Sequence, residues 1–475
     1  MYPQFETDKI LVKCHPSPRQ LAVEQMEFYA FAHFTVNTFT DKEWGDGNEP
    51  ETIFDPTALD ADQWVDALKA AGAAGLLLTC KHHEGFCLWP SKYTEHCVKN
   101  SPFRGGKGDV VREVSDACRK GGIKFGVYLS PWDRNSRLYG QGKAYDDYFC
   151  NQLTELCTEY GELFSVWFDG ACGEGPNGKK QVYDWDRYYA LIRKLQPNAA
   201  IAISGPDIRW CGNEAGDTRE SEWSVLPTGF DDPDAVAAKS QQADDGKFRE
   251  KKISETERDL GSRFFLENAA GYAWRPAETD TSIRPGWFYH ASEDDRVRST
   301  ETLLDIWYRT VGGNSTLLLN IPPDKRGLFH ETDVQRLREM GETLRKTFAV
   351  NFAETAAITA DRDDGYHPAE NVRENNYQAY YKPFDGENAV MLTFKLEKPQ
   401  EVTHVVLKEH IPMSQRIEKY AVEAKLPDGA WREIARGTTV GYQKIERFEA
   451  VRTDALRIRI LDSRVCPVLS FVGIY

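Results

Sequence analysis

The segment Val166-Trp167-Phe168-Asp169-Gly170 brings an indole and a carboxylate together at the end of an apolar run. An apolar run that stops at a carboxylate and a glycine is typical of a buried strand followed by a turn. Side chains alternate along a strand, so Trp167 and Asp169 are predicted to face the same way. An indole beside a carboxylate suits a sugar, because the ring packs on C–H groups while the acid addresses the anomeric carbon. The alternative is that Asp169 only caps the next helix.

Strand-then-helix units must position this segment. Strands are predicted at 28–36, 76–83, 125–129, 163–168, 199–203 and 316–321. Helices are predicted at 60–73, 109–119, 146–160, 185–195, 302–310 and 332–347. Between about 205 and 298 the rhythm gives way to long loops. Repeated units over this length predict a (β/α)8-type barrel with some irregularity. An open doubly wound sheet is the alternative, which the lack of a GxGxxG turn disfavours.

The pattern changes after about Phe348. Short alternating segments follow, punctuated by turn pairs such as Asp385-Gly386 and Asp428-Gly429; they lie at 390–395, 401–408, 420–425 and 455–460. This spacing predicts an antiparallel β-sandwich. We therefore expect a catalytic barrel over 1–348 and a sandwich of the carbohydrate-binding-module type over 349–475.

Composition limits the classes of partner and the cellular compartment that we expect for this protein. The formal net charge of −15 disfavours nucleic acid, because an acidic surface repels phosphate. No apolar run has the length of a membrane span, so no membrane partner is expected. Ten scattered cysteines without a CxxC pair favour a reducing compartment, and a cytoplasmic location is predicted. A periplasmic or secreted protein whose signal peptide had been removed would look the same.

If the barrel forms, the loops after its strands share one face, and residues distant in sequence converge there. The candidates are histidines, aromatic residues and carboxylates: His33, Glu43, Trp44, His82, His83, Tyr128, Trp132, Trp167, Asp169, Trp210, Glu214, Glu220, Glu222, Glu278 and Trp287. Neutral histidine offers a sugar hydroxyl one donor and one acceptor. Any single aromatic residue of this set could instead only pack in the core.

Two other chemistries compete for these residues. A metal site would use His33, His82 and His83, but neighbours on a strand point to opposite faces, and no HExxH motif is present. A nucleophilic serine would need a GxSxG elbow, which is missing, and nothing in the sequence marks Cys172 as activated. We predict neither a metal nor a cofactor.

A pair of carboxylates fits best. Glycoside hydrolysis needs one group that attacks or activates water and another that protonates the leaving oxygen. Asp169 is the predicted nucleophile. Glu214 is the predicted acid/base, because it lies one strand later in a Gly-Asn-Glu turn near Trp210. Three other glutamates compete, each of which could be a solvated surface acid: Glu220, Glu222 and Glu278.

Four ordered blocks resemble glycoside hydrolase family 29, the α-L-fucosidases. They are His33–Thr40 with Glu43-Trp44-Gly45, Lys81–Phe86, Tyr128–Trp132 and Val166–Gly170. The resemblance covers roughly residues 20–350, and the C-terminal β region resembles the sandwich appended to these enzymes.

The resemblance implies a retaining exo-α-L-fucosidase in which Asp169 forms a fucosyl-enzyme that water then hydrolyses. It implies that fucose is held by His33, Glu43, Trp44, His82, His83, Tyr128 and Trp167. Trp210, Asp207 and Trp287 are expected to contact the fucose or the leaving sugar.

Three segments resemble the subfamily that prefers α-1,3/1,4-linked fucose, as in Lewis-type glycans: Thr38-Phe39-Thr40, Glu43-Trp44-Gly45-Asp46-Gly47 and the Gly212-Asn213-Glu214 turn. In that subfamily the matching glutamate is the acid/base, which implies Glu214, with Glu278 as runner-up. The expected partner is a fucosylated oligosaccharide. A retaining glycosidase of other sugar specificity and a non-catalytic carbohydrate-binding protein remain the alternatives.

Overall fold

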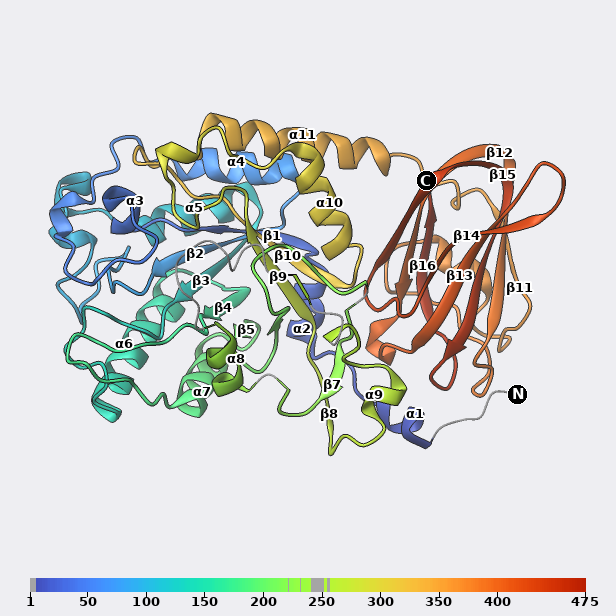
Figure 1. The fold of residues 1–475 in the computed structure, drawn as a ribbon, viewed down its shortest axis with the longest axis horizontal. Coiled ribbons are helices and arrows are strands. Elements are labelled where there is room, and N and C mark those ends of the chain that lie inside the picture. Colours follow the sequence, from blue (N-terminus) through green and yellow to red (C-terminus); the bar gives the residue numbers. More distant parts are fainter. Residues whose placement is uncertain (1–5, 221, 231, 241–251, 254–256) are drawn as a thin grey trace.

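The computed structural model describes residues 6–220, 222–230, 232–240, 252–253 and 257–475. These residues form two parts that lie side by side, a barrel of parallel strands wrapped by helices and a domain of antiparallel strands (Figure 1). The predicted fold class, a (β/α)8-type barrel followed by an antiparallel β-sandwich, is confirmed.

Parallel strands form the barrel in the order β5-β4-β3-β2-β1-β10-β9-β6. Their bounds are β1 Phe28–Ala32, β2 Gly75–Lys81, β3 Lys124–Leu129, β4 Ser165–Phe168, β5 Ala200–Ile203, β6 Arg209–Trp210, β9 Ala277–Ser282 and β10 Ser315–Asn320. Strand β1 pairs with both β2 and β10. The two edge strands, β5 and β6, are linked by an isolated parallel bridge between Ala202 and Ile208. The sheet is therefore nearly closed, and the carboxyl ends of its strands meet at one mouth.

The outer helices each bury an apolar stripe against the strands. They are α4 Ala61–Ala71, α5 Val110–Gly121, α6 Lys143–Glu159, α7 Trp185–Leu195, α10 Thr300–Thr310 and α11 Glu331–Thr347. Helices α4 and α5 also begin at a capping aspartate and end at a glycine. In α4, Asp60 caps the first turn by accepting from Gln63 N, and Gly72 ends the helix at φ +90°, where a side chain would be strained. The buried stripe of α4 includes Trp64 and Leu68.

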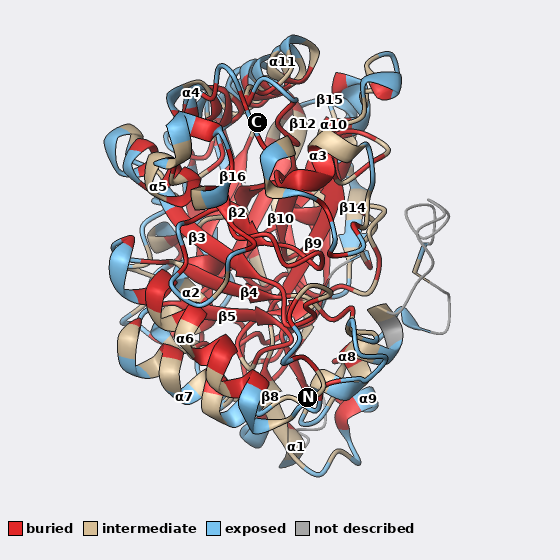
Figure 2. Ribbon diagram, turned by 90° about the vertical axis from the view of Figure 1, so that its left-hand side faces the viewer, coloured by how far each residue is buried: buried red, intermediate tan, exposed pale blue. Residues whose placement is uncertain are grey.

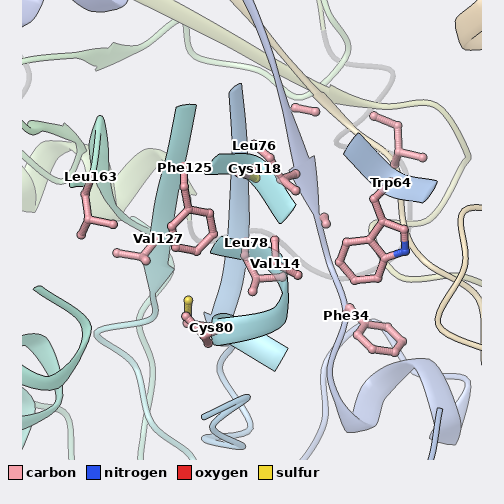
Figure 3. Close-up of a cluster of buried hydrophobic side chains, with 14 of the residues drawn as sticks. Phe34, Trp64, Leu76, Leu78, Cys80, Val114, Cys118, Phe125, Val127 and Leu163 are labelled. Atoms are coloured by element: carbon pink, nitrogen blue, oxygen red, sulfur yellow. The ribbon is translucent and has the colours of Figure 1, made fainter. Parts of the chain in front are cut away.

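The core between these helices and the strands is apolar (Figure 3). Leu76 and Leu78 of β2 and Val127 of β3 are fully buried, and Val114 of α5 packs against them. Figure 2 shows the strands buried in the middle and the helices exposed on their outer sides. The barrel therefore supplies a rigid frame whose mouth can hold polar side chains.

The second half of the barrel departs from the regular pattern. Residues 204–208 connect β5 to β6 without a helix. The segment that follows contains β7 Val225–Pro227, which pairs with β8 Tyr272–Trp274, and the short helices α8 Pro233–Ser240 and α9 Arg263–Leu266. The prediction of long loops over 205–298 was wrong for β6 and β9, since both are barrel strands. Strand β9 has the sequence AETDTS, so it lacks the apolar run by which the other strands were recognised.

The N-terminal strand was predicted too long. Strand β1 ends at Ala32, and the short helix α3 Val36–Thr40 begins after Thr35 caps it by accepting from Asn37 N. Two more helices, α1 Glu6–Leu11 and α2 Pro18–Glu24, precede β1. Within the described part of the chain, no helix combines the length and the apolar character needed to cross a bilayer.

The C-terminal domain is built on two strands of 20 residues each, β12 Val390–Glu409 and β15 Lys444–Ser463. Its other strands are β11 Ala357–Ala360, β13 Ile417–Lys425, β14 Trp431–Gly437 and β16 Leu469–Ile474, in the order β11-β12-β15-β13-β14 with β16 on β12. The segments predicted at 390–395 and 401–408 are one strand with irregular pairing between Lys395 and Gln400. Alternate residues such as Leu392 and Phe394 fill the core of this domain.

Apolar and ionic contacts fix the domain to the barrel. Val406, Ile445 and Phe471 belong to the same apolar cluster as the outer helices of the barrel. Arg263 on α9 is buried and bonds Asp8 on α1 at 3.0 Å and Asp462 on β15 at 2.6 Å. Burial raises the pKa of Asp8, and Arg263 opposes that rise. The arginine therefore connects the N-terminal helix, the barrel insertion and the β-domain.

Arg263→Met should lower the thermal unfolding midpoint measured by circular dichroism. The change leaves Asp8 buried without its cation, and breaking one side of a buried ion pair costs about 3 kcal/mol. Arg436→Met is the matched control, because Arg436 pairs with Glu433 at the exposed surface and should leave the midpoint unchanged. Equal midpoints for Arg263→Met and the parent would show that the pair does not hold the domains together.

Candidate active site

Asp169 lies directly after β4, at the mouth of the barrel. Its Oδ2 accepts from the Tyr128 hydroxyl at 3.1 Å, and its Oδ1 accepts from Ala171 N at 2.8 Å. The Nε2 of His83 is 3.7 Å from Oδ2. Burial raises the pKa of Asp169, while the Ala171 N–H, His82 and Tyr128 oppose that rise. The carboxylate is 22% exposed, so it is held in place and still open to a ligand.

The histidines beside Asp169 are set in defined tautomers by their partners. Ser130 Oγ donates to Trp132 O at 2.7 Å, so it accepts from His83 Nδ1 at 2.8 Å. Burial, followed by the neighbouring His82, lowers the pKa of His83 well below its usual value. His83 is therefore neutral, with a lone pair on the Nε2 that faces the carboxylate. A ligand hydroxyl placed between them can donate to either atom.

The end of β2 explains how two adjacent histidines face one site. Strand β2 ends at Lys81, so His82 and His83 lie beyond the last residue to which strand alternation applies. Their ring centroids are 4.1 Å apart, and the His82 centroid is 5.7 Å from that of His33. The expectation that His82 and His83 point to opposite faces was wrong for this reason.

His33 follows β1 and is fixed by Asn320 at the end of β10. The Nδ1 atom of His33 donates to Asn320 Oδ1 at 2.8 Å, because the Asn320 amide nitrogen donates to Ser282 Oγ and Trp287 O. The ring centroids of His33 and Trp287 are 5.1 Å apart. Asn320 thus couples the histidine to the tryptophan loop.

Three tryptophans of the predicted set each donate their indole N–H to a carboxylate. Trp167 Nε1 bonds Glu278 Oε1 at 2.7 Å, Trp210 Nε1 bonds Asp280 Oδ1 at 2.7 Å, and Trp287 Nε1 bonds Glu214 Oε2 at 3.0 Å. Glu278 also accepts from the Tyr29 hydroxyl. The orientation of each indole is therefore fixed by a charged or ionisable partner.

Glu214 lies in a turn that follows β6. Asn213 Oδ1 accepts from Ala215 N and Asp217 N, which closes the turn on itself. Gly212 has φ +108°, a conformation that favours glycine and starts the turn immediately after Cys211. The Glu214 side chain is thereby brought to Trp287, on the opposite loop of the mouth.

Glu278 and Asp280 are the most buried carboxylates of this group. Glu278 is 1% exposed, and burial raises its pKa to about 7. Asp280 is 4% exposed, and burial followed by the charge of Glu214 raises its pKa well above the usual value. The suggestion that Glu278 could be a solvated surface acid was wrong.

Glu43 is engaged by the loop that carries Trp287. Its carboxylate accepts from Trp287 N at 2.8 Å, from Phe288 N at 3.0 Å and from His290 Nε2 at 2.7 Å. The neighbouring Trp44 places its ring edge-on to His83, with centroids 5.6 Å apart. Glu43 therefore shapes the wall of the site by fixing that loop.

Three acids named from sequence do not join this group. Glu222 is fully buried and bonds Arg209 at 2.6 Å and Arg219 at 3.0 Å, and Glu220 is exposed. Asp207 bonds Arg19 at 3.2 Å and accepts from Ile201 N at the start of β5. It lies at the opposite end of the strands, so the expectation that it contacts the sugar was wrong.

Sequence reasoning missed Asp280, Ser130 and Asn320. Asp280 was recognisable only by the alternation Glu278-Thr279-Asp280-Thr281-Ser282, which has the period of a strand with a polar inner face. Within the described residues, no three His, Cys, Asp or Glu side chains are grouped so as to hold a metal ion.

The family model for alpha-L-fucosidase matches residues 17–347, which span the whole barrel. The chain belongs to the alpha-L-fucosidase family. This fucosidase is 38% identical to alpha-L-fucosidase 1 of Arabidopsis thaliana, over 99% of its own length and 91% of the relative. It is a glycoside hydrolase with α-L-fucosidase activity.

Solved structures resemble the fucosidase over both domains. The crystal structure of a candidate alpha-L-fucosidase from Bacteroides ovatus is 46% identical, with a TM-score of 0.86 and coverage of 99% of this chain and 75% of that one. A Ruminococcus gnavus family 29 fucosidase, solved in complex with fucose, is 28% identical, with a TM-score of 0.83 and coverage of 97% and 95%.

The fucosidase should lose stability above neutral pH through His290. Its bond to Glu43, helped by Asp41, raises the pKa of His290 from 6.5 to about 9. The folded protein then binds the proton more tightly than the unfolded chain, so this contribution is complete below about pH 6.5 and is lost as pH rises through about 9.

The test is the thermal midpoint of the parent and of His290→Gln between pH 6 and 10. The parent should be the more stable protein at pH 6, and the difference should shrink on the alkaline side. Parallel curves for the two proteins would show that the His290 bridge is not the source.

Proposed function

We propose that this fucosidase is a retaining exo-enzyme that releases terminal α-1,3/1,4-linked L-fucose from oligosaccharides or glycoconjugates. The observation that carries the proposal is the setting of Asp169. It is a partly exposed carboxylate at the barrel mouth, with Tyr128 and Ala171 N donating to its two oxygens and a neutral His83 beside it. Such a group can attack the anomeric carbon of a sugar whose hydroxyls bind the histidines.

The chemistry proceeds in two displacements. Asp169 attacks C1 of fucose while Glu214 donates a proton to the glycosidic oxygen, which leaves with the rest of the glycan. The C1–O bond to the leaving sugar breaks as the ester bond to Asp169 forms. Glu214, now a carboxylate, takes a proton from water, whose oxygen attacks C1 and frees Asp169. Two inversions at C1 retain the configuration of the sugar.

An apolar wall beside the histidines supports fucose as the sugar. Fucose carries a methyl group on C5, which needs an apolar surface next to the groups that bind its hydroxyls. The ring of Phe31 is 4.9 Å from that of His33 and 5.0 Å from that of Trp167, centroid to centroid. Phe288 lies 5.0 Å from His82 in the same measure. The fucose in the Ruminococcus gnavus structure is consistent with this choice.

Other residues of the predicted set are proposed to bind the sugar. His33, His82, His83 and Tyr128 meet its hydroxyls, while Trp44, Trp167, Trp210 and Trp287 pack on its C–H groups or on those of the leaving sugar. The preference for α-1,3/1,4 linkages is supported by the Gly212-Asn213-Glu214 turn, from which Glu214 accepts a hydrogen bond from the Trp287 indole.

A reducing compartment such as the cytoplasm is proposed as the place of action. The support is that all ten cysteines are free thiols, and that burial raises the pKa of several of them, Cys80 and Cys87 among them. Thiols of this kind stay protonated and unreactive.

Asp169→Asn should abolish release of fucose without altering the fold, because the amide cannot form the ester. The assay is hydrolysis of a fucosylated trisaccharide, with circular dichroism to verify folding. With the parent enzyme, NMR at early times should show α-L-fucose before its mutarotation. Turnover near the parent level in Asp169→Asn would remove Asp169 as the nucleophile, and β-L-fucose as the first product would exclude retention.

Glu214→Gln should slow hydrolysis of natural glycans by about 10²–10⁴-fold, because their leaving oxygens need a proton. Activated aryl fucosides, whose leaving groups depart as anions, should be affected far less in the first step. Glu220→Gln is the matched control, since Glu220 is an exposed acid of the same stretch. Equal losses on both substrates would argue against Glu214 as the acid.

A further inference from the structure

Strand β9 carries two inward carboxylates that the proposed reaction does not use. Glu278 and Asp280 are two residues apart, so they project from the same side of the strand into the barrel. Each accepts an indole N–H at 2.7 Å, Glu278 from Trp167 and Asp280 from Trp210. The same indole-to-carboxylate hydrogen bond therefore occurs twice along β9, once at Glu278 and once at Asp280.

Keeping Glu278 in the barrel costs free energy. It is 1% exposed, and its pKa is raised to about 7 by burial. Burying a carboxyl group is unfavourable unless hydrogen bonds replace its water. Both oxygens of Glu278 accept such bonds, from Trp167 Nε1 and the Tyr29 hydroxyl. A carboxyl group held in this way is committed to its donors and is poorly placed to protonate a leaving sugar.

The bond to Glu278 selects one orientation of the Trp167 ring. Trp167 packs between Phe31 and Tyr128, with ring centroids at 5.0 and 5.1 Å. Aromatic packing alone tolerates a ring flip, but a flip would move Nε1 away from its acceptor. The indole lies one residue from Phe168 and two from Asp169, so its orientation decides which face is offered to a sugar on that carboxylate.

Asp280 acts in the same way on the strand that leads to Glu214. Trp210 ends β6, and Cys211, the next residue, donates its N–H to Glu278 O at 2.9 Å. The Trp210–Asp280 bond and this backbone bond together tie the start of the Glu214 turn to β9. Asp280 is close enough to Glu214 that, after burial, the charge of Glu214 contributes to the raised pKa of Asp280.

Resting on the proposed function above, we propose that Glu278 and Asp280 are positioning residues of the fucosidase. Glu278 orients Trp167 against the bound sugar, and Asp280 fixes Trp210 and with it the base of the acid/base turn. Neither residue transfers a proton to the substrate.

A matched pair elsewhere in the molecule serves as the control. Trp274 Nε1 donates to Glu24 Oε2 at 3.0 Å, and both residues are 4% exposed. Burial raises the pKa of Glu24 to about 8, so its setting is comparable to that of Glu278. This pair lies by α2, where Gln20 bonds both Trp274 O and Asp207 O at the end of the barrel away from the mouth.

The test is a double-mutant cycle on Glu278 and Trp167. Glu278→Met removes the acceptor, Trp167→Phe removes the donor, and kcat/KM is measured for a fucosylated trisaccharide and an aryl fucoside. Glu278→Met should lower kcat/KM about tenfold on both substrates, and it should cost little more in the Trp167→Phe background, as expected for residues in contact. Glu278→Gln, whose carbonyl can still accept the indole N–H, should recover most of the activity.

Three results would overturn the proposal. They are additive losses in the cycle, a loss confined to the trisaccharide, which would indicate proton transfer by Glu278, and a Glu278→Gln variant as impaired as Glu278→Met. If Glu278→Met does not fold, the cycle is run with Glu278→Gln, where a loss that persists in the Trp167→Phe background counts against the proposal. Glu24→Met should lower the thermal midpoint and leave kcat/KM unchanged.

The same design applies to Asp280 and Trp210. Asp280→Ala and Trp210→Phe should be non-additive, and Asp280→Asn should recover activity because its amide oxygen accepts the same bond. The outcome is separable from that of the proposed function. An active Asp169→Asn enzyme would refute the proposed mechanism, whereas an inactive one combined with additive cycles would refute only the positioning role.

Discussion

The structure of the site depends on one requirement, that the indole and imidazole groups buried at the barrel mouth find hydrogen-bond partners. An unpaired buried donor or acceptor costs more than a typical hydrogen bond contributes to stability. The indoles of Trp167, Trp210 and Trp287 therefore bond carboxylates, and His33 bonds Asn320. The partners that satisfy these groups also fix their directions. Stability and preorganisation of the site thus arise from the same contacts.

The same requirement sets the charge around Asp169. His83 is kept neutral by burial and by its bond to Ser130, so its lone pair faces the carboxylate and the two can share a ligand hydroxyl. The Tyr128 hydroxyl and Ala171 N donate to Asp169 and oppose the effect of burial on its pKa. The role proposed for Asp169, that of a nucleophile, needs a carboxylate that is ionised but not fully stabilised by its surroundings. Two hydrogen bonds and one neutral imidazole give a setting of that kind.

The irregular half of the barrel has a direct use in this arrangement. Residues 204–208 join β5 to β6 without a helix, so the chain returns to the mouth after a short connection. A long insertion then separates β6 from β9. That segment contacts the β-domain through Arg263. The β-domain therefore supports the insertion between β6 and β9, beyond its apolar contact with the outer helices of the barrel.

The sequence alone determined the barrel, the β-domain and most of the residues at the mouth, because apolar runs that end in His, Trp or Asp mark the ends of parallel strands. It identified Asp169, Trp167 and the histidines as neighbours for that reason. Only the tertiary structure showed that Glu278 and Asp280 are buried and bond tryptophans, since β9 is polar and its strand character comes from pairing with β6 and β10. It also separated Asp207 and Glu222 from the site. Asp207 pairs with Arg19, which is distant in sequence, and Glu222 pairs with Arg209 inside the protein. Long-range partners determine the burial and the ionisation of a carboxylate, and local spacing does not record them.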